Sequence, residues 1–365
     1  MIKLEIVEQA NRALVQSRPL VAVFVGAAQG TGEYALRELA KTHGVDGKGL
    51  NAYLVARNEE RAEKILGQCR DVCPNGHFHY VKAGDLSLLR DVDAVCTRLE
   101  TAFKEDRPGG NAPNIDILCL THIISRFGPP TYLIKADVLG AVTDEGLETT
   151  MSLHYYSRMR FITNLLLYLT TSEHTAHIIS ICSAGAEILW GTFYPDDLSL
   201  SKDPKAHYTY VNCRAHTTRM MTMFFETLAQ QHRGKLSLIH SYPGMVFGPT
   251  HWSSLQPIWF QILQRVLYAA RYFIATSPEE SGQRTVFYAT SRYPARSGSG
   301  QASRDVAMST DRVVGGGSYS CWSGNDDINV EKAYTDLKKD GFQARVWDHT
   351  NEVLETISNG QRFIE

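Results

Sequence analysis

The chain lacks an excess of charge of either sign. Its 365 residues include 37 lysines and arginines against 39 aspartates and glutamates, a formal net charge of −2. A nucleic-acid-binding protein needs a clustered excess of basic residues to contact phosphates, so this class is disfavoured. Hydrophobic residues make up 43% and charged residues 21%, which excludes extensive disorder. The length allows one large α/β domain with elaborations, or two small domains.

Zinc-type cysteine pairs and long apolar runs are also missing. The seven cysteines are an odd number, and Cys69 and Cys73 are spaced CxxxC rather than CxxC. We therefore expect buried free thiols in a reducing compartment, and no metal site. No apolar stretch reaches the roughly 18 residues of a membrane-spanning helix, and the charged N-terminus has no signal-peptide core. The sequence predicts a cytoplasmic protein without a membrane span.

Strand and helix patterns alternate through most of the chain. Short apolar, β-branched runs predict strands at 20–25, 50–56, 77–81, 115–120, 177–182 and 236–241. Helical periodicity lies between them at 33–43, 59–72, 86–103, 147–170 and 208–231. This alternation predicts an α/β fold, a doubly wound parallel sheet with helices on both faces.

The pattern changes after the sixth predicted strand. An aromatic-rich helix is predicted at 259–275. Residues 291–326 are rich in serine, glycine and arginine and predict a long surface loop with a short final strand. Helical periodicity returns at 328–358. We therefore treat residues 291–365 as a C-terminal extension that packs on the domain formed by residues 1–290.

A glycine-rich turn joins the first strand to the first helix of this pattern. Its sequence is Gly26-Ala-Ala-Gln-Gly-Thr-Gly32, so Gly26, Gln29, Gly30, Thr31 and Gly32 are the candidate residues. The first glycine permits a tight turn, and the others let backbone N–H groups at a helix N-terminus approach a pyrophosphate. This context predicts a dinucleotide cofactor.

Two further motifs follow the fifth predicted strand. Ser183 ends the run Ser180-Ile-Cys-Ser183, and Tyr208 and Tyr210 begin the next helix. With the glycine-rich turn, these motifs resemble the short-chain dehydrogenase/reductase family over about residues 18–250. The helix at 155–167 and the run His240-Ser-Tyr-Pro-Gly244 are most similar to fungal members associated with secondary metabolism.

The resemblance implies a single Rossmann fold in residues 1–290 and an NAD(P) cofactor. It also implies a substrate pocket covered by the segment at about 249–276. Family members often pair through the two helices equivalent to 147–170 and 208–231, which implies a homodimer or homotetramer. The aromatic residues of the expected pocket cover favour a small hydrophobic metabolite of bulky shape; they are Trp190, Phe193, Trp252, Trp259 and Phe260.

The residues at the end of the second strand indicate whether NAD(H) or NADP(H) binds. An aspartate there would bind the ribose 2′-hydroxyl of NAD, but this chain has Arg57-Asn58, and Arg57 would clamp the 2′-phosphate of NADP(H). The alternative is a surface arginine that starts a helix. Other positions matched to the family's cofactor site are Asp85, Leu86, Thr121, Pro243 and Gly244. Where the family has Asn-Ala-Gly, this chain has Thr121-His122-Ile123.

The family's reduction chemistry implies a tyrosine acid, a cation one helical turn later and a serine that holds the carbonyl oxygen. Counting back from Leu228-Ala229 favours Tyr210 as the acid and places Arg214 where the family has lysine. Starting from Tyr208 would place the uncharged Asn212 there. Ser183 matches the family serine. The family's asparagine aligns with Tyr155, so the water relay that it organises is altered.

Three functions remain open at this point. The first is an NADP(H)-dependent ketoreductase or dehydrogenase. The second is an enzyme of the same fold that isomerises or cyclises its substrate without net redox change. The third is a non-catalytic protein that senses NADP.

Overall fold

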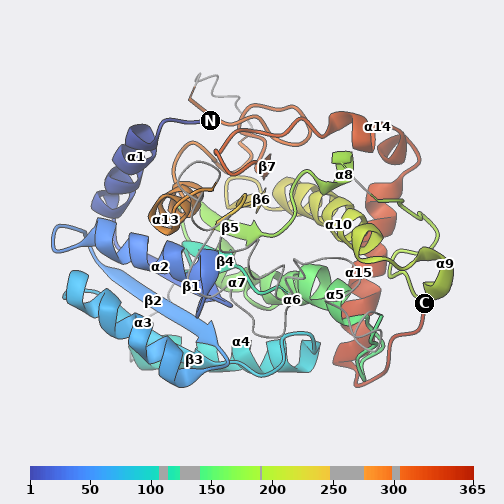
Figure 1. Cartoon of the computed structure of the whole chain (residues 1–365), viewed down its shortest axis with the longest axis horizontal. Helices are drawn as coiled ribbons and strands as arrows, with labels where there is room; N and C mark the ends of the chain where they lie inside the picture. Colours follow the sequence, from blue (N-terminus) through green and yellow to red (C-terminus); the bar gives the residue numbers. More distant parts are fainter. Residues whose placement is uncertain (107–113, 124–139, 190, 247–274, 298–304) are drawn as a thin grey trace, which may run out of the picture.

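The computed structural model describes residues 1–106, 114–123, 140–189, 191–246, 275–297 and 305–365 (Figure 1). Within them, seven parallel strands form one sheet in the order β3-β2-β1-β4-β5-β6-β7. The strands are β1 Leu20–Val25, β2 Leu50–Ala56, β3 His77–Lys82, β4 Ile117–Leu120, β5 Ala176–Ile181, β6 Leu236–Ser241 and β7 Ser318–Cys321. The predicted doubly wound α/β fold is confirmed. The strand order reverses direction between β1 and β4, where such sheets bind ligands at the carboxyl ends of their strands.

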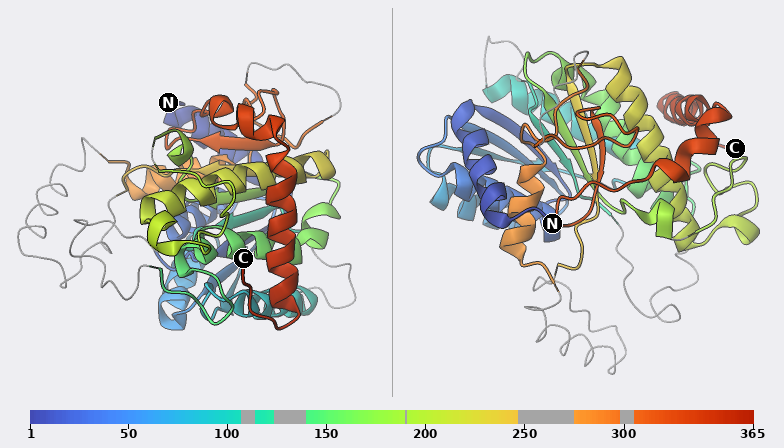
Figure 2. Two further views of the ribbon diagram at one scale, coloured as in Figure 1. Left: turned by 90° about the vertical axis from the view of Figure 1, so that its right-hand side faces the viewer. Right: turned by 90° about the horizontal axis from the view of Figure 1, so that it is seen from above.

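One helical layer covers the first face of the sheet. It contains α1 Leu4–Ser17, α2 Gly30–His43, α3 Glu59–Val72 and α13 Pro278–Phe287 (Figures 1 and 2). Neither α1 nor α13 was predicted. The start of α13 carries an ordinary signal, because Ser277 caps it by accepting from the Glu280 N–H at 3.1 Å and Pro278 follows at once. Gly282 lets α13 approach α2, since a Cβ there would lie 2.4 Å from the Tyr34 carbonyl oxygen.

A second layer covers the opposite face. Its main helices are α4 Leu89–Asp106, α6 Ser157–Asn164, α10 Tyr210–Gln231 and α15 Phe342–Ser358. The helix predicted at 147–170 is present from Thr149 to Thr170, but it is not regular and is interrupted at Leu165. The chain forms α5 Thr149–Met151, a π-helical turn η1 at Ser152–Tyr156, then α6 and α7 Leu166–Thr170. Such π turns re-aim side chains and are frequent at functional sites.

The C-terminal residues belong to the same structure as the sheet. β7 pairs with β6, and α14 Glu331–Lys339 and α15 are separated by Gly341, which adopts a left-handed φ of 68°. α15 lies across α10, α4 and the π turn (Figure 2). Trp347 stacks on Phe224 of α10 with ring centroids 4.7 Å apart, and the Tyr155 hydroxyl lies 2.7 Å from Thr350 Oγ1. α15 therefore covers faces through which the resemblance implies self-association.

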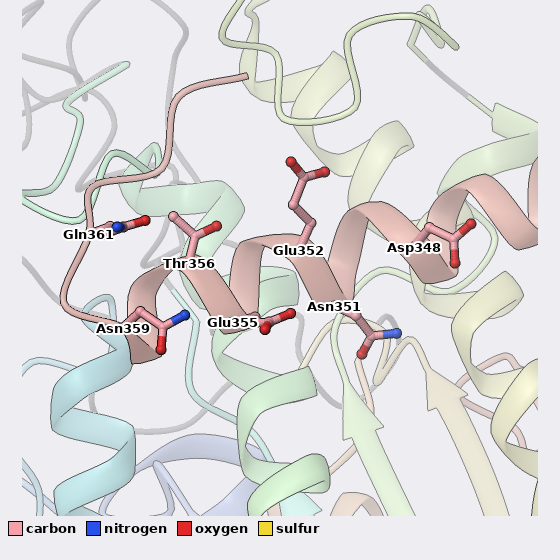
Figure 3. Close-up of a pocket in the computed structure, with 7 residues that line it drawn as sticks. All are labelled: Asp348, Asn351, Glu352, Glu355, Thr356, Asn359 and Gln361. Carbon is pink, nitrogen blue, oxygen red and sulfur yellow. The ribbon is translucent and has the colours of Figure 1, made fainter.

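The outer side of α15 is polar and forms an acidic hollow (Figure 3). The residues that line it are Asp348, Asn351, Glu352, Glu355, Thr356, Asn359 and Gln361. None of the predicted catalytic or cofactor residues lies there. In the described segments, no helix is both long and apolar enough to cross a membrane.

Candidate active site

Most of the predicted site residues gather where the parallel strands end. They follow β1, β2, β3, β4, β5 and β6 in turn, as Gly26, Arg57, Asp85, Thr121, Ser183 and Pro243. A parallel sheet brings these ends to one edge, so residues far apart in sequence become neighbours there. Tyr210 and Arg214 come from α10, which packs behind β6 and β7.

The glycine-rich turn forms a close-fitting cradle. Gly26 has a φ of 77°, and a Cβ there would lie 2.7 Å from the His122 backbone nitrogen. A Cβ on Gly32 would lie 2.4 Å from the Thr121 hydroxyl oxygen and 2.8 Å from the Ala27 Cβ. Only glycine fits either place, because one must turn left-handed and the other lets α2 approach the sheet.

The N-terminal end of α2 is open at Gly30. Gly30 has a φ of 63°, and a Cβ on it would meet nothing within 4 Å. Gln29 is extended at the N-cap, and its side chain makes no capping hydrogen bond. The N–H groups of Gly30 and Thr31 are therefore not used by that side chain. A helix start of this kind suits an anion such as a pyrophosphate, so these residues fit a dinucleotide.

The residues after β2 place positive charge beside this turn. Arg57 is exposed. Asn58 caps α3, because its Oδ1 accepts a hydrogen bond from the Arg61 N–H at 2.7 Å. The Asn58 side-chain oxygen is therefore used by the helix cap. The Arg61 guanidinium reaches back to Gln29 and donates to its Oε1 at 3.3 Å. Arg61 was missed in the sequence, although its place one turn into α3 is a recognisable signal.

The remaining predicted cofactor residues shape the edge of the site. Asp85 is exposed, and its Oδ1 accepts from the Ser87 N–H at 3.0 Å. Leu86 is buried beneath it. The Thr121 hydroxyl donates to the Val25 carbonyl at 2.9 Å and so ties β4 to β1. These contacts position the backbone; the contacts of the side chains with an adenine stay a prediction.

The turn after β6 brings Pro243 and Gly244 to the same edge. Gly244 has a φ of 74°, and a Cβ there would lie 2.8 Å from the Ser323 Cβ. The Tyr242 N–H donates to the Cys321 carbonyl at 3.0 Å, so β7 anchors this turn.

Ser183 is buried at the end of β5. Its hydroxyl lies 3.0 Å from Thr218 Oγ1 and 3.5 Å from the Cys182 sulfur, and its N–H donates to His240 Nε2 at 3.2 Å. Thr218 is eight residues after Tyr210 on α10, a rise of about 12 Å. In this structure the serine hydroxyl therefore contacts α10 two turns beyond the tyrosine.

The two candidate tyrosines occupy different surroundings. Tyr210 is the first residue of α10, and the Arg214 guanidinium carbon lies 5.9 Å from its ring centroid. Tyr208 precedes the helix, and its hydroxyl donates to Thr150 Oγ1 at 3.4 Å. Burial, with nearby Cys213 and Glu148, raises the pKa of Tyr208 well above its ordinary value. Tyr208 is therefore anchored to α5, whereas Tyr210 lies beside the cation.

His154 occupies the place where Tyr155 was expected. Tyr155 turns away to bond Thr350 under α15, and its predecessor His154 faces the site, with its ring 6.3 Å from that of Tyr210. The side chain that faces Tyr210 is therefore that of His154, one residue before the position matched to the family's asparagine. The π turn explains the difference, because it changes which residues of the helix share a face.

Several expected pocket residues lie elsewhere or outside the described residues. Phe193 packs on His216 and Phe342, at 4.6 and 5.3 Å between ring centroids, so it belongs to the core around α10 and α15. The lid at 249–276 falls almost entirely outside the described residues, as do Trp190, Trp252, Trp259 and Phe260. In the part of the chain that the structure describes, no group of three or more His, Cys, Asp or Glu side chains is arranged to hold a metal.

Comparisons with known proteins agree with the fold described above. No protein-family model matches the chain. It is 33% identical over 366 residues to the short-chain dehydrogenase/reductase SAT2 of Stachybotrys chartarum, which covers 98% of both chains. It is 30% identical over 369 residues to the oxidoreductase andH of Emericella variicolor, also over 98% of both chains.

Two solved structures share the fold. L-sorbose reductase from Gluconobacter frateurii, solved with NADPH and L-sorbose, is 19% identical with a TM-score of 0.50, covering 76% of this chain and 92% of that one. The angucycline C-6 ketoreductase LanV, solved with NADP, is 17% identical with the same TM-score, covering 76% and 90%. Given the near full-length match to the first of these relatives, this chain belongs to the short-chain dehydrogenase/reductase family.

Proposed function

We propose that this protein is an NADP(H)-dependent oxidoreductase that reduces a carbonyl group, or oxidises the matching alcohol, on a bulky hydrophobic metabolite. The observation that carries the proposal is the position of Arg214 over the ring of Tyr210, at the strand edge that also holds the glycine cradle. A cation beside a phenol favours its ionised form, which is what a proton-transferring tyrosine requires.

In this proposal the residues of the chain would have the following roles. Gly26, Gly30 and Gly32 would hold the cofactor's pyrophosphate against the start of α2. When bound, NADPH would supply the hydride. Tyr210 would give the proton to the substrate oxygen, with Arg214 lowering the cost of the charge left behind. Ser183 would hold that oxygen, which requires its hydroxyl to leave Thr218.

Two arginines support NADP(H) over NAD(H). Arg57 is exposed at the end of β2, and Arg61 reaches Gln29 of the glycine-rich turn. A 2′-phosphate beside this turn would meet both charges. A guanidinium can make two charge-assisted hydrogen bonds to a phosphate. The NADP and NADPH named for the two solved structures agree with this choice.

The proposed pathway class is fungal secondary metabolism. The relatives that support it are named only as oxidoreductases of fungi, and one solved structure of the same fold is an angucycline C-6 ketoreductase. The compartment proposed is the cytoplasm. All seven cysteines are buried and none of them forms a disulfide, as expected in a reducing environment.

The second candidate function is isomerisation or cyclisation without net redox change. It is favoured by the arginine in the place of the family's lysine. Arginine is longer and planar, so Arg214 would not reproduce every hydrogen bond of a lysine. The hydroxyl of Ser183, which contacts Thr218 instead of facing an open site, also suits this candidate.

The test measures cofactor binding and turnover separately. Fluorescence titration should show NADPH binding more tightly than NADH, and Arg57→Ala should lower NADPH affinity by about 1.5–3 kcal/mol while leaving NADH unchanged. Arg12→Ala on α1 is the matched control, another exposed arginine away from the strand edge. Equal affinity for both cofactors would contradict the NADP assignment, and no binding of either would favour the non-catalytic candidate.

Turnover should then be followed over a panel of polycyclic and terpenoid ketones. A reductase consumes one NADPH for each product molecule. Product without NADPH consumption would replace the redox proposal with the isomerase or cyclase.

The position of α15 affects how this chain could self-associate. Because α15 covers α10, α4 and the π turn within the same chain, pairing through those helices would require it to move. Its outer side carries three acidic side chains, those of Asp348, Glu352 and Glu355. The homodimer or homotetramer that the family resemblance implies would therefore pair through another surface, and light scattering at micromolar concentration tests it; a monomer at that concentration would contradict it.

A further inference from the structure

Arg158, the second residue of α6, is fully buried. The five N–H groups of its guanidinium have five acceptors at 2.6 to 3.3 Å, which are the carbonyl oxygens of Leu120, His122, Leu153 and Ile181 and the hydroxyl of Ser180. Every donor of the side chain is therefore used. All five acceptors are neutral, and among the described residues no carboxylate pairs with Arg158, so hydrogen bonds have to offset the cost of burying its charge.

Four of these acceptors lie at the ends of two neighbouring strands. The hydrogen-bonded ladder between β4 and β5 ends at the pair Leu120–Ser180. Arg158 binds both members of this pair, and it also binds the carbonyls of His122 and Ile181, which lie beyond the pair. The guanidinium therefore joins the two strands past the point where their own ladder stops.

Each strand end that Arg158 holds forms one side of the candidate site. The His122 backbone borders the cofactor cradle, since a Cβ on Gly26 would lie 2.7 Å from the His122 nitrogen. On the other strand, Ile181 lies two residues before Ser183. One side chain therefore connects the cofactor side of the site with the serine side.

The strands themselves have other supports at these ends. The Thr121 N–H donates to a β1 carbonyl at 2.9 Å, and the Cys182 N–H donates to a β6 carbonyl at 2.8 Å. Loss of the Arg158 hydrogen bonds would therefore leave the sheet in place and would free the two ends to move relative to each other. A lysine cannot replace the guanidinium, because it has three donors instead of five and lacks the planar fork.

We propose that Arg158 is a positioning residue that sets the distance between the cofactor cradle and Ser183 by holding the ends of β4 and β5 together. The inference rests on the proposed function, in which Ser183 holds the substrate oxygen beside the cofactor. Reacting atoms must lie about 3–3.5 Å apart, and a displacement of about 1 Å can lower the rate roughly 10²-fold. Arg158 therefore acts on the rate of hydride transfer more than on cofactor binding, which depends on α2 and its glycines.

The first measurement needs no substrate. Amide hydrogen exchange, followed by mass spectrometry, compares wild type with Arg158→Lys. The Thr121 and Cys182 N–H groups report on the two strand ends, and their exchange should become roughly 10-fold faster, because fewer hydrogen bonds oppose local opening. Exchange in β2 and α3, which Arg158 does not contact, should stay unchanged.

Two further variants make this result specific. Ser180→Ala removes one acceptor and keeps the arginine, so it should accelerate exchange at the same N–H groups by a smaller factor, and it replaces Arg158→Lys if that variant does not fold. Arg160→Lys is the matched control, because Arg160 lies two residues later on α6 and pairs with Asp93 of α4; it should leave both strand ends unchanged. Exchange that is unaltered at the strand ends, or raised equally throughout the chain, would overturn the inference.

The second measurement separates positioning from folding. On a polycyclic ketone that wild type reduces, Arg158→Lys should lower kcat roughly 10–10²-fold while NADPH affinity stays within about twofold of wild type. In a Ser183→Ala background the same substitution should cost little more, because the group that it positions is gone. Equal losses with and without Ser183 would overturn the inference, since Arg158 would then act on stability alone. Product formed without NADPH consumption would instead overturn the proposed function and leave the exchange result standing.

Discussion

The cofactor end and the catalytic end of this sheet are built by different means. At the cofactor end, Gly26 and Gly32 act through backbone shape, and each is required because a Cβ would collide with a neighbour. At the catalytic end, the chemistry depends on side chains from β5, η1 and α10 that meet only in the folded chain. A position that requires a particular backbone shape is visible in the sequence as a glycine. A contact between side chains that lie far apart in the chain leaves no local pattern.

The two ends also differ in what supports them. The cofactor end is formed by consecutive βα units, β1 to β3 with α2 and α3. The catalytic end depends on residues 305–365, since β7 anchors the turn at Pro243, α15 packs on α10 and Lys338 of α14 pairs with Glu226 of α10. Variants at the two ends should therefore fail in different ways.

The largest effect is expected at Tyr210. Tyr210→Phe removes the transferred proton but keeps the ring beside Arg214, so turnover should fall about 10²–10⁴-fold while NADPH affinity stays unchanged. Tyr208→Phe loses only a long hydrogen bond to Thr150 and should keep most of its activity. Steady-state kinetics and fluorescence titration check both. The reverse pattern would show that Tyr208 is the acid.

A large stability effect is expected from the contact of α14 with α10. Lys338 Nζ lies 2.7 Å from Glu226, whose carboxylate is buried and also accepts from Thr310. Lys338→Met should cost about 3 kcal/mol at neutral pH, because it leaves a buried charge without its partner. Lys339→Met is the control, since its pair with Asp336 is exposed, and it should change stability by less than about 0.5 kcal/mol.

The same pair predicts a pH dependence. Burial raises the pKa of Glu226 above its ordinary value, and Lys338 opposes this rise. The folded state therefore holds a proton that the unfolded state has lost, and stability falls as pH rises through the folded pKa. Losing Lys338 raises that pKa further, so the penalty should be larger at pH 8 than at pH 5 in chemical denaturation. An equal penalty at both pH values would mean that the carboxylate is stabilised by other groups.

A smaller effect is expected at the cofactor cradle. Gly26→Ala forces a Cβ against His122 at a left-handed φ, and should cost roughly 2 kcal/mol of stability together with cofactor binding. Gly67→Ala in α3 meets nothing within 4 Å and should instead gain about 0.5–1 kcal/mol, because alanine favours a helix interior. Thermal unfolding with and without NADPH measures both. A stable, NADPH-binding Gly26→Ala would show that the backbone there can relax.

The smallest effect is expected near the end of the chain. The Glu365 carboxylate accepts from the Leu198 and Ser199 N–H groups at 3.1 and 2.9 Å, and so holds the loop that leads to Tyr210. Glu365→Gln keeps one acceptor oxygen and should cost about 1 kcal/mol. Glu355→Gln, in the exposed hollow of α15 (Figure 3), should cost nothing measurable. A larger loss at Glu355 would mean that the acidic hollow stabilises the fold.

Local sequence patterns were sufficient for the alternating core of the fold. The six predicted strands and the helices between them follow from apolar periodicity, and the glycine-rich turn follows from its place between a strand and a helix. α13 had its Ser277-Pro278 start signal and was overlooked, and α1 has only three buried residues to mark it. The family resemblance, which the near full-length relative confirms, also came from these local motifs.

Tertiary structure alone decided which side chains meet. A π turn adds one residue to a helical turn, and this turned His154 toward Tyr210 and sent Tyr155 under α15. Arg158 looks in the sequence like an ordinary helix residue, and only the fold brings its guanidinium to the carbonyls of Leu120 and His122 at the end of β4. The physical reason is that periodicity reports burial, which is a property of each residue, whereas a proton path depends on distances between residues far apart in the chain.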